Sequence, residues 1–137
     1  MMNFFDNIEN ARAIIKLLVP AFMAILFLQS GMDKVFQRSG NEAYITDFFK
    51  KTFLLQYASI LLTVTTILEL TAGILSAVGV VALFYGNVLW AFWGLIFSAA
   101  SFLSLLFGMR IAKDFPGSVS MASYMALTVL GLLLLIY

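Results

Sequence analysis

The segment TFLLQYASILLTVTTILELTAGILSAVGVVALFYGNVLWAFWGLIFSAASFLSLLFGM, residues 52–109, decides the fold, because Glu69 is its only charged residue. A membrane-spanning helix needs roughly 20 apolar residues, so this segment is too long for one span and long enough for two. The break falls at residues 85–87, Tyr-Gly-Asn, where a turn-forming pair follows an aromatic residue typical of membrane interfaces. We therefore predict antiparallel neighbouring spans at about 53–84 and 88–109.

Two further apolar segments flank this pair and predict a first span at about 12–36 and a fourth at 118–137. The polar stretch 37–51 separates the first two spans. Its apolar residues recur at helical spacing, which predicts an amphipathic segment on the membrane surface: Tyr44, Ile45, Phe48 and Phe49. The predicted fold class is thus all-α, an integral membrane four-helix bundle forming a single domain over 1–137.

Composition supports this prediction and excludes several classes of function. The chain is 63% hydrophobic and 11% charged, whereas a soluble domain is roughly 25% charged. The lipid bilayer is therefore the expected partner, and a net charge of +1 gives no indication of nucleic-acid binding. The sequence contains no Cys and no His, so we expect no thiol redox chemistry, no His-ligated haem and no metal site of the usual zinc type.

Basic residues predict the orientation in the membrane. The side that holds both termini carries Arg12 and Lys16. The loops 33–51 and 110–117, on the other side, carry six basic residues: Lys34, Arg38, Lys50, Lys51, Arg110 and Lys113. The positive-inside rule therefore places these loops in the cytoplasm and the termini outside, in the cell's inner (cytoplasmic) membrane. Lys34 and Arg110 are expected to reach the lipid head groups, and the alternative is that the long side chain of either one reaches inward.

Glu69 is the main candidate for a functional residue, because a charge near the centre of a bilayer costs about 3 kcal/mol or more. Small and hydroxyl-bearing residues share its helix face, so we expect it to point into the bundle, where Gln29 would donate a hydrogen bond to it. The candidate ligand-binding residues are Glu69, Gln29, Ser30, Lys34, Thr65 and Thr66. The candidates for close helix packing are Gly31, Gly73, Ser76, Gly94 and Ser98.

Two interpretations of Glu69 remain open at this point. In the functional one, its carboxyl group binds a polar head group, such as a quinone carbonyl or a lipid, or exchanges a proton. In the structural one, a protonated Glu69 joins helices through hydrogen bonds.

Two motifs carry a resemblance to a known family. They are Phe27-Leu-Gln-Ser-Gly-Met-Asp-Lys34 at the end of the first span and Glu69-Leu-Thr-Ala-Gly-Ile-Leu75, followed by Gly79, in the second. In these motifs, and in the turn from Arg110 to Phe115, the chain resembles the DoxX family of four-helix bacterial membrane proteins. The motif positions that match the family are Gly31, Lys34, Glu69 and Gly73.

The resemblance implies a place in membrane redox systems. The namesake of the family is similar to a subunit of a thiosulfate:quinone oxidoreductase, and the fold is similar to that of vitamin K epoxide reductase. The cysteines of such a reductase are missing here, so its chemistry does not carry over. The expected function is an accessory or quinone/lipid-binding subunit that is not catalytic alone, with a quinone as the candidate cofactor.

Its expected protein partner is a redox subunit or a second copy of the chain. The alternatives are a small proton-coupled transporter that uses Glu69 and a purely structural or assembly protein.

Overall fold

The structure is a computed structural model that describes residues 4–137. These residues form an all-α fold, and the helices long and apolar enough to cross a membrane number four, as predicted. A short helix, α2, joins the first two spans. The elements are α1 (Phe4–Phe36), α2 (Arg38–Phe48), the 3-10 helix η1 (Phe53–Tyr57), α3 (Ala58–Leu83), α4 (Leu89–Ile111) and α5 (Phe115–Ile136).

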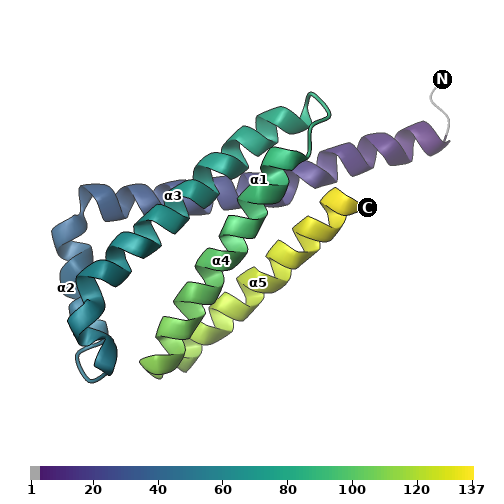
Figure 1. Cartoon of the computed structure of the whole chain (residues 1–137). Helices are drawn as coiled ribbons and strands as arrows, with labels where there is room; N and C mark the ends of the chain where they lie inside the picture. Colours follow the sequence, from purple (N-terminus) through teal and green to yellow (C-terminus); the bar gives the residue numbers. More distant parts are fainter. Residues whose placement is uncertain (1–3) are drawn as a thin grey trace.

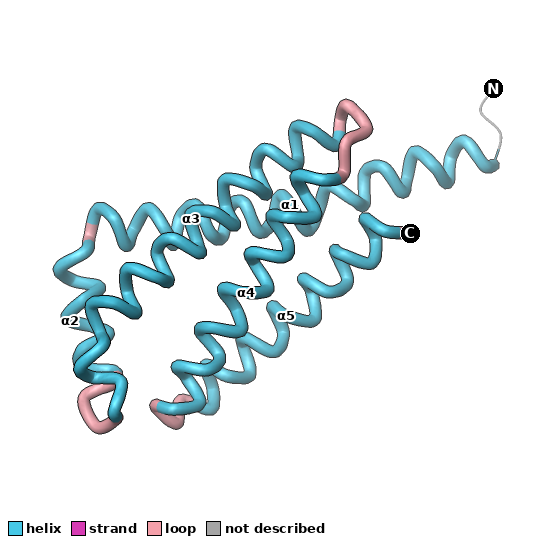
Figure 2. The backbone as a smooth tube through the Cα atoms, viewed as in Figure 1, coloured by secondary structure: helices cyan, strands magenta, loops and turns pink. Residues whose placement is uncertain are grey.

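The long helices pack so that α3 contacts both α1 and α4, while α5 packs mainly on α4 (Figure 1). Short turns connect α3 to α4 and α4 to α5, whereas α2 and η1 lie between α1 and α3 (Figure 2). Both termini lie toward one end of the bundle, and α2 lies at the other end together with the turn between α4 and α5 (Figure 1). The fold thus places α2 beside the ends of α1, α3 and α4, and this is where the candidate site forms.

Two helix starts differ from the predicted spans. The first helix begins at Phe4 rather than near residue 12 and runs for 33 residues, with Asp6 in its first turn, where a carboxylate favours helix. Its N-terminal part extends past the other helices (Figure 1). The last helix begins at Phe115 because Asp114 caps it, accepting a hydrogen bond from the backbone N–H of Gly117 at 3.0 Å.

A buried aromatic cluster joins three of the helices. Phe27 of α1 packs on Phe102 of α4 with ring centroids 5.0 Å apart, and Phe102 stacks on Tyr124 of α5 at 5.2 Å. Phe27 and Phe102 are each only 2% exposed. This cluster fixes α1 and α5 against α4.

Small residues bring α3 close to both of its neighbours. A Cβ atom on Gly73 would lie 2.8 Å from the backbone nitrogen of Leu28, so α1 and α3 touch through their main chains. One turn further along α3, a Cβ on Gly94 of α4 would lie 2.7 Å from the backbone nitrogen of Ser76. Such close approach is typical of helix contacts built on small residues in membranes.

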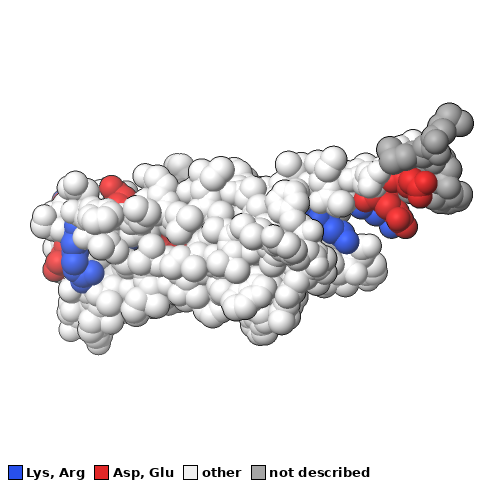
Figure 3. All heavy atoms as spheres, turned by 90° about the horizontal axis from the view of Figure 1, so that it is seen from above, with Lys and Arg blue, Asp and Glu red and all other residues white. Residues whose placement is uncertain are grey.

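The outer surface of the bundle fits a bilayer. In Figure 3 the charged side chains gather at the two ends of the molecule, and a wide uncharged band separates them. Large apolar side chains on the spans face outward. Examples are Ile25 of α1, Ile67 of α3, Leu103 of α4 and Leu130 of α5, all more than half exposed. In a membrane these side chains contact lipid.

Candidate functional site

Glu69 sits in the middle of α3, is 2% exposed and is bound by two side chains of α1. Lys34 Nζ forms an ion pair with Glu69 Oε2 at 2.9 Å. Ser30 Oγ donates a hydrogen bond to the same oxygen, also at 2.9 Å. Lys34 Nζ in turn donates to Ser30 Oγ at 2.8 Å, which closes a three-membered polar cluster between α1 and α3.

This geometry corrects two expectations for the first helix. Gln29 is exposed and does not bind Glu69, because its position is turned by one residue, about 100°, from the face that contacts α3. Ser30 and Lys34 lie on that face, one turn apart, and both reach the carboxylate. Lys34 therefore points into the bundle, with 15% of its side chain exposed, rather than out to the lipid head groups.

Arg110 does stay at the end of its helix, as expected. It is exposed, and its guanidinium carbon lies 4.7 Å from the ring centre of Phe115. This is a cation–π contact across the turn between α4 and α5.

The ion pair has an energetic consequence for Lys34. Removing one partner of a buried pair leaves an uncompensated charge and typically costs 3 to 5 kcal/mol, on the order of a whole domain's marginal stability. Glu69 thus holds the ammonium group inside the protein. An ammonium group has three N–H donors, and Glu69 and Ser30 account for two of them.

A cavity of about 210 Å³ adjoins Lys34. The apolar face of α2 lines one side of this cavity, and the ends of α3 and α4 line the other sides. Most of the side chains that line it are apolar or aromatic: Tyr44, Ile45, Phe48, Phe49, Leu54, Leu61, Leu105, Phe107 and Met109. The predicted amphipathic helix therefore turns its apolar face toward a pocket over the ends of the spans.

Few polar groups face this cavity besides Lys34, and several are already engaged. The Asn41 amide donates to Asp33 and to the backbone oxygen of Gln37, and so ties α2 to the end of α1. Ser104 Oγ donates to the carbonyl oxygen of Ala100 at 2.9 Å. Asp114 and Thr65 complete the polar lining.

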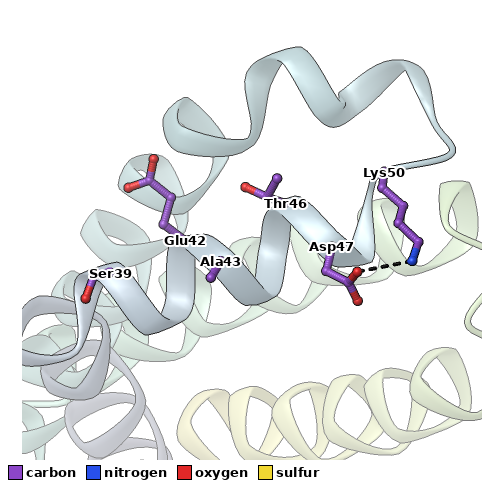
Figure 4. Close-up of a pocket in the computed structure, with 6 residues that line it drawn as sticks. All are labelled: Ser39, Glu42, Ala43, Thr46, Asp47 and Lys50. Carbon is purple, nitrogen blue, oxygen red and sulfur yellow. Dashed lines mark hydrogen bonds and ion pairs between the residues drawn. The ribbon is translucent and has the colours of Figure 1, made fainter.

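The other face of α2 is polar. Glu42, Thr46 and Asp47 belong to this face, and Lys50 Nζ pairs with Asp47 Oδ1 at 3.2 Å (Figure 4). Both side chains of this pair are more than half exposed. The two faces of α2 thus match a helix lying between water and an apolar interior.

The remaining predicted site residues fall into three groups. Thr65 lines the cavity. Thr66 is buried, and its hydroxyl donates to the carbonyl oxygen of Leu62 in its own helix at 2.7 Å. The predicted packing residues are all buried, and four of them lie at close contacts between helices: Gly31, Gly73, Ser76 and Gly94. The fifth, Ser98, donates to the carbonyl oxygen of Gly94 in its own helix.

Sequence reasoning missed Asp114 and the cavity itself. The amphipathic pattern of residues 37–51 was the signal that could have identified the α2 side chains lining the cavity. No local signal marks Asp114, because it faces the cavity only through the packing of the α4–α5 turn against α2. Within the described residues, no group of His, Cys, Asp or Glu could hold a metal ion.

A model of the DoxX family matches residues 15–99 of the chain. This range includes Lys34, Glu69, most of α1, all of α3 and the first half of α4, and it ends before α5. No curated protein and no solved structure matches the chain.

Proposed function

This chain belongs to the DoxX family and is a multi-pass membrane protein, and from that premise we propose that it binds the head group of an isoprenoid quinone as an accessory subunit of a membrane-associated redox system. The observation that carries the proposal is the N–H of Lys34 left over by Glu69 and Ser30, beside an aromatic cavity. A quinone carbonyl oxygen would accept a hydrogen bond from it.

The size and place of the cavity support a ring-shaped head group with an apolar tail. Its volume of about 210 Å³ is below the roughly 300–1,000 Å³ of pockets that enclose a whole drug-sized ligand. An aromatic ring would fill it, and the tail would remain outside among the lipids. The cavity lies at the ends of α3 and α4, the depth at which a membrane-borne head group meets water.

In this proposal Glu69 is a positioning residue. It is not among the residues that line the cavity; it holds the ammonium group that does. The chain has no Cys and no His, so we assign the electron transfer to a partner subunit. The transporter alternative has no comparable observation in its favour, because Glu69 is packed between α1 and α3 at 2% exposure.

The double variant Lys34→Met/Glu69→Met tests the proposal. It removes the ammonium group together with the charge that would otherwise be stranded, and methionine matches the length of glutamate and is one atom shorter than lysine. We expect affinity for a short-tailed benzoquinone to fall about tenfold or more, because a hydrogen bond from a charged donor is lost. Isothermal titration calorimetry on the full chain in lipid nanodiscs measures the effect.

Two further variants make this experiment decisive. Lys50→Met/Asp47→Met removes the exposed ion pair of α2 by the same substitutions and should leave binding unchanged. Gly108→Leu should block the cavity, because Gly108 lines it and a Cβ there would already lie 3.1 Å from the ring of Phe49, which lines it as well. Unchanged quinone affinity in both the folded Gly108→Leu protein and the Lys34/Glu69 double variant would refute the proposal.

We propose the inner membrane as the location, with both termini outside and α2 in the cytoplasm. The basic residues on the α2 side support this orientation. The sequence has no Cys, so a single cysteine at Gly40 gives a clean probe on exposed α2. We expect an impermeant maleimide to label it in inverted membrane vesicles and not in intact cells. Labelling in cells whose inner membrane is accessible to the reagent would show the opposite orientation, with α2 outside.

A further inference from the structure

Asp114 brings a second charge to the cavity, from a different element than Lys34. It belongs to the turn between α4 and α5 and is half-buried. Its Oδ1 accepts the N–H of Gly117 at 3.0 Å and so caps α5. Among the residues that the structure describes, no cation lies within ion-pair distance of Asp114, because Lys34 pairs with Glu69 and Arg110 stacks on Phe115.

The cavity therefore offers both kinds of hydrogen-bonding capacity. Lys34 has one N–H beyond those used by Glu69 and Ser30, and this N–H needs an acceptor. The Asp114 carboxylate has a second oxygen, Oδ2, which can only accept. An oxidised quinone ring has carbonyl acceptors and no O–H, so it satisfies the first group and not the second. A quinol ring has hydroxyl groups that satisfy both.

The charge balance also argues against an anionic ligand. Lys34 and Asp114 are the two charged residues that line the cavity, and Glu69 already neutralises Lys34, so the carboxylate of Asp114 is the one lining charge without an ion-pair partner in the described part of the chain. A phosphate group placed beside this carboxylate would be repelled by it, whereas an uncharged ring with hydroxyl groups would not.

We propose that this cavity selects the reduced, quinol form of its ligand, with Asp114 accepting a hydrogen bond from a ring hydroxyl and Lys34 donating to a ring oxygen. The inference rests on the proposed function and adds to it the redox form that the site prefers and the residue that sets the preference. Asp114 acts here as a specificity-determining residue, and the preference is a difference in binding that involves no reaction.

Asp114→Asn is the sharpest test, because asparagine is as good a helix N-cap as aspartate and keeps an oxygen for Gly117. Its amide nitrogen would then donate into the cavity, where the carboxylate accepted. Affinities for a short-tailed benzoquinol, kept reduced under anaerobic conditions, and for the matching benzoquinone are measured by calorimetry in nanodiscs. We expect the wild-type chain to bind the quinol about tenfold more tightly, and Asp114→Asn to lose or invert this preference.

The controls separate this inference from the proposed function. Asp47→Asn makes the same change on the exposed face of α2 and should leave the preference intact. Equal binding of both forms by the wild-type chain, or an equal change for both forms in Asp114→Asn, would overturn the inference and leave quinone binding standing. Binding of neither form would overturn the proposed function itself. Binding of an anionic phospholipid in competition with the quinol would contradict the charge argument.

Discussion

Gly73→Leu should separate α1 from α3 and lower the free energy of unfolding by about 3 kcal/mol or more. A Cβ atom at this position would already lie 2.8 Å from the backbone nitrogen of Leu28, and a backbone atom cannot move aside as a side-chain end can. The leucine would also pull Ser30 and Lys34 away from Glu69, because these contacts bridge the same two helices. Titration with SDS in mixed micelles, followed by circular dichroism, measures the loss.

Gly40→Leu is the matched control for this variant. Gly40 is also a helical glycine, on α2, but a Cβ there meets no atom within 4 Å. The same substitution should be neutral or stabilise the protein by up to about 1 kcal/mol, because leucine favours helix more than glycine does. Similar unfolding curves for the two variants would show that the contact between α1 and α3 does not depend on close approach at Gly73.

Lys34→Met should lower the free energy of unfolding by about 3 to 5 kcal/mol, because it strands the carboxylate of Glu69 at 2% exposure. Ser30 would remain as its hydrogen-bond donor from α1, and one hydroxyl does not replace an ammonium group. Adding Glu69→Met should restore most of the stability, since a buried ion pair replaced by apolar residues of similar volume is often neutral. The same SDS titration, run as a double-mutant cycle, measures the coupling between the two residues.

The exposed pair on α2 supplies the comparison. Lys50→Met removes a cation whose partner, Asp47, is 76% exposed, so the expected change is within about 1 kcal/mol. Additive effects of Lys34→Met and Glu69→Met would mean that the two charges do not stabilise one another. The inward position of Lys34 beside the cavity would then have a cause other than the attraction of Glu69.

Some residues of the site could be predicted from the sequence and others could not, and the arrangement of the site explains why. Glu69 was identifiable because a lone carboxylate among apolar residues is costly in a bilayer whatever its neighbours are. The apolar face of α2 was identifiable from the spacing of Tyr44, Ile45 and Phe48, which now line the cavity. Asp114 was not, since an acidic residue in a polar turn has no distinguishing local pattern.

The sequence by itself determined the class of protein, the four spans and the amphipathic helix between the first two. These depend on the length and period of apolar runs, which are local properties of the chain. Only the tertiary structure decided which side chain meets Glu69. Gln29 and Ser30 are neighbours in the sequence, yet one is exposed and the other binds the carboxylate. Each residue turns a helix by about 100°, and the close contact of α1 with α3 at Gly73 selects the face that points inward.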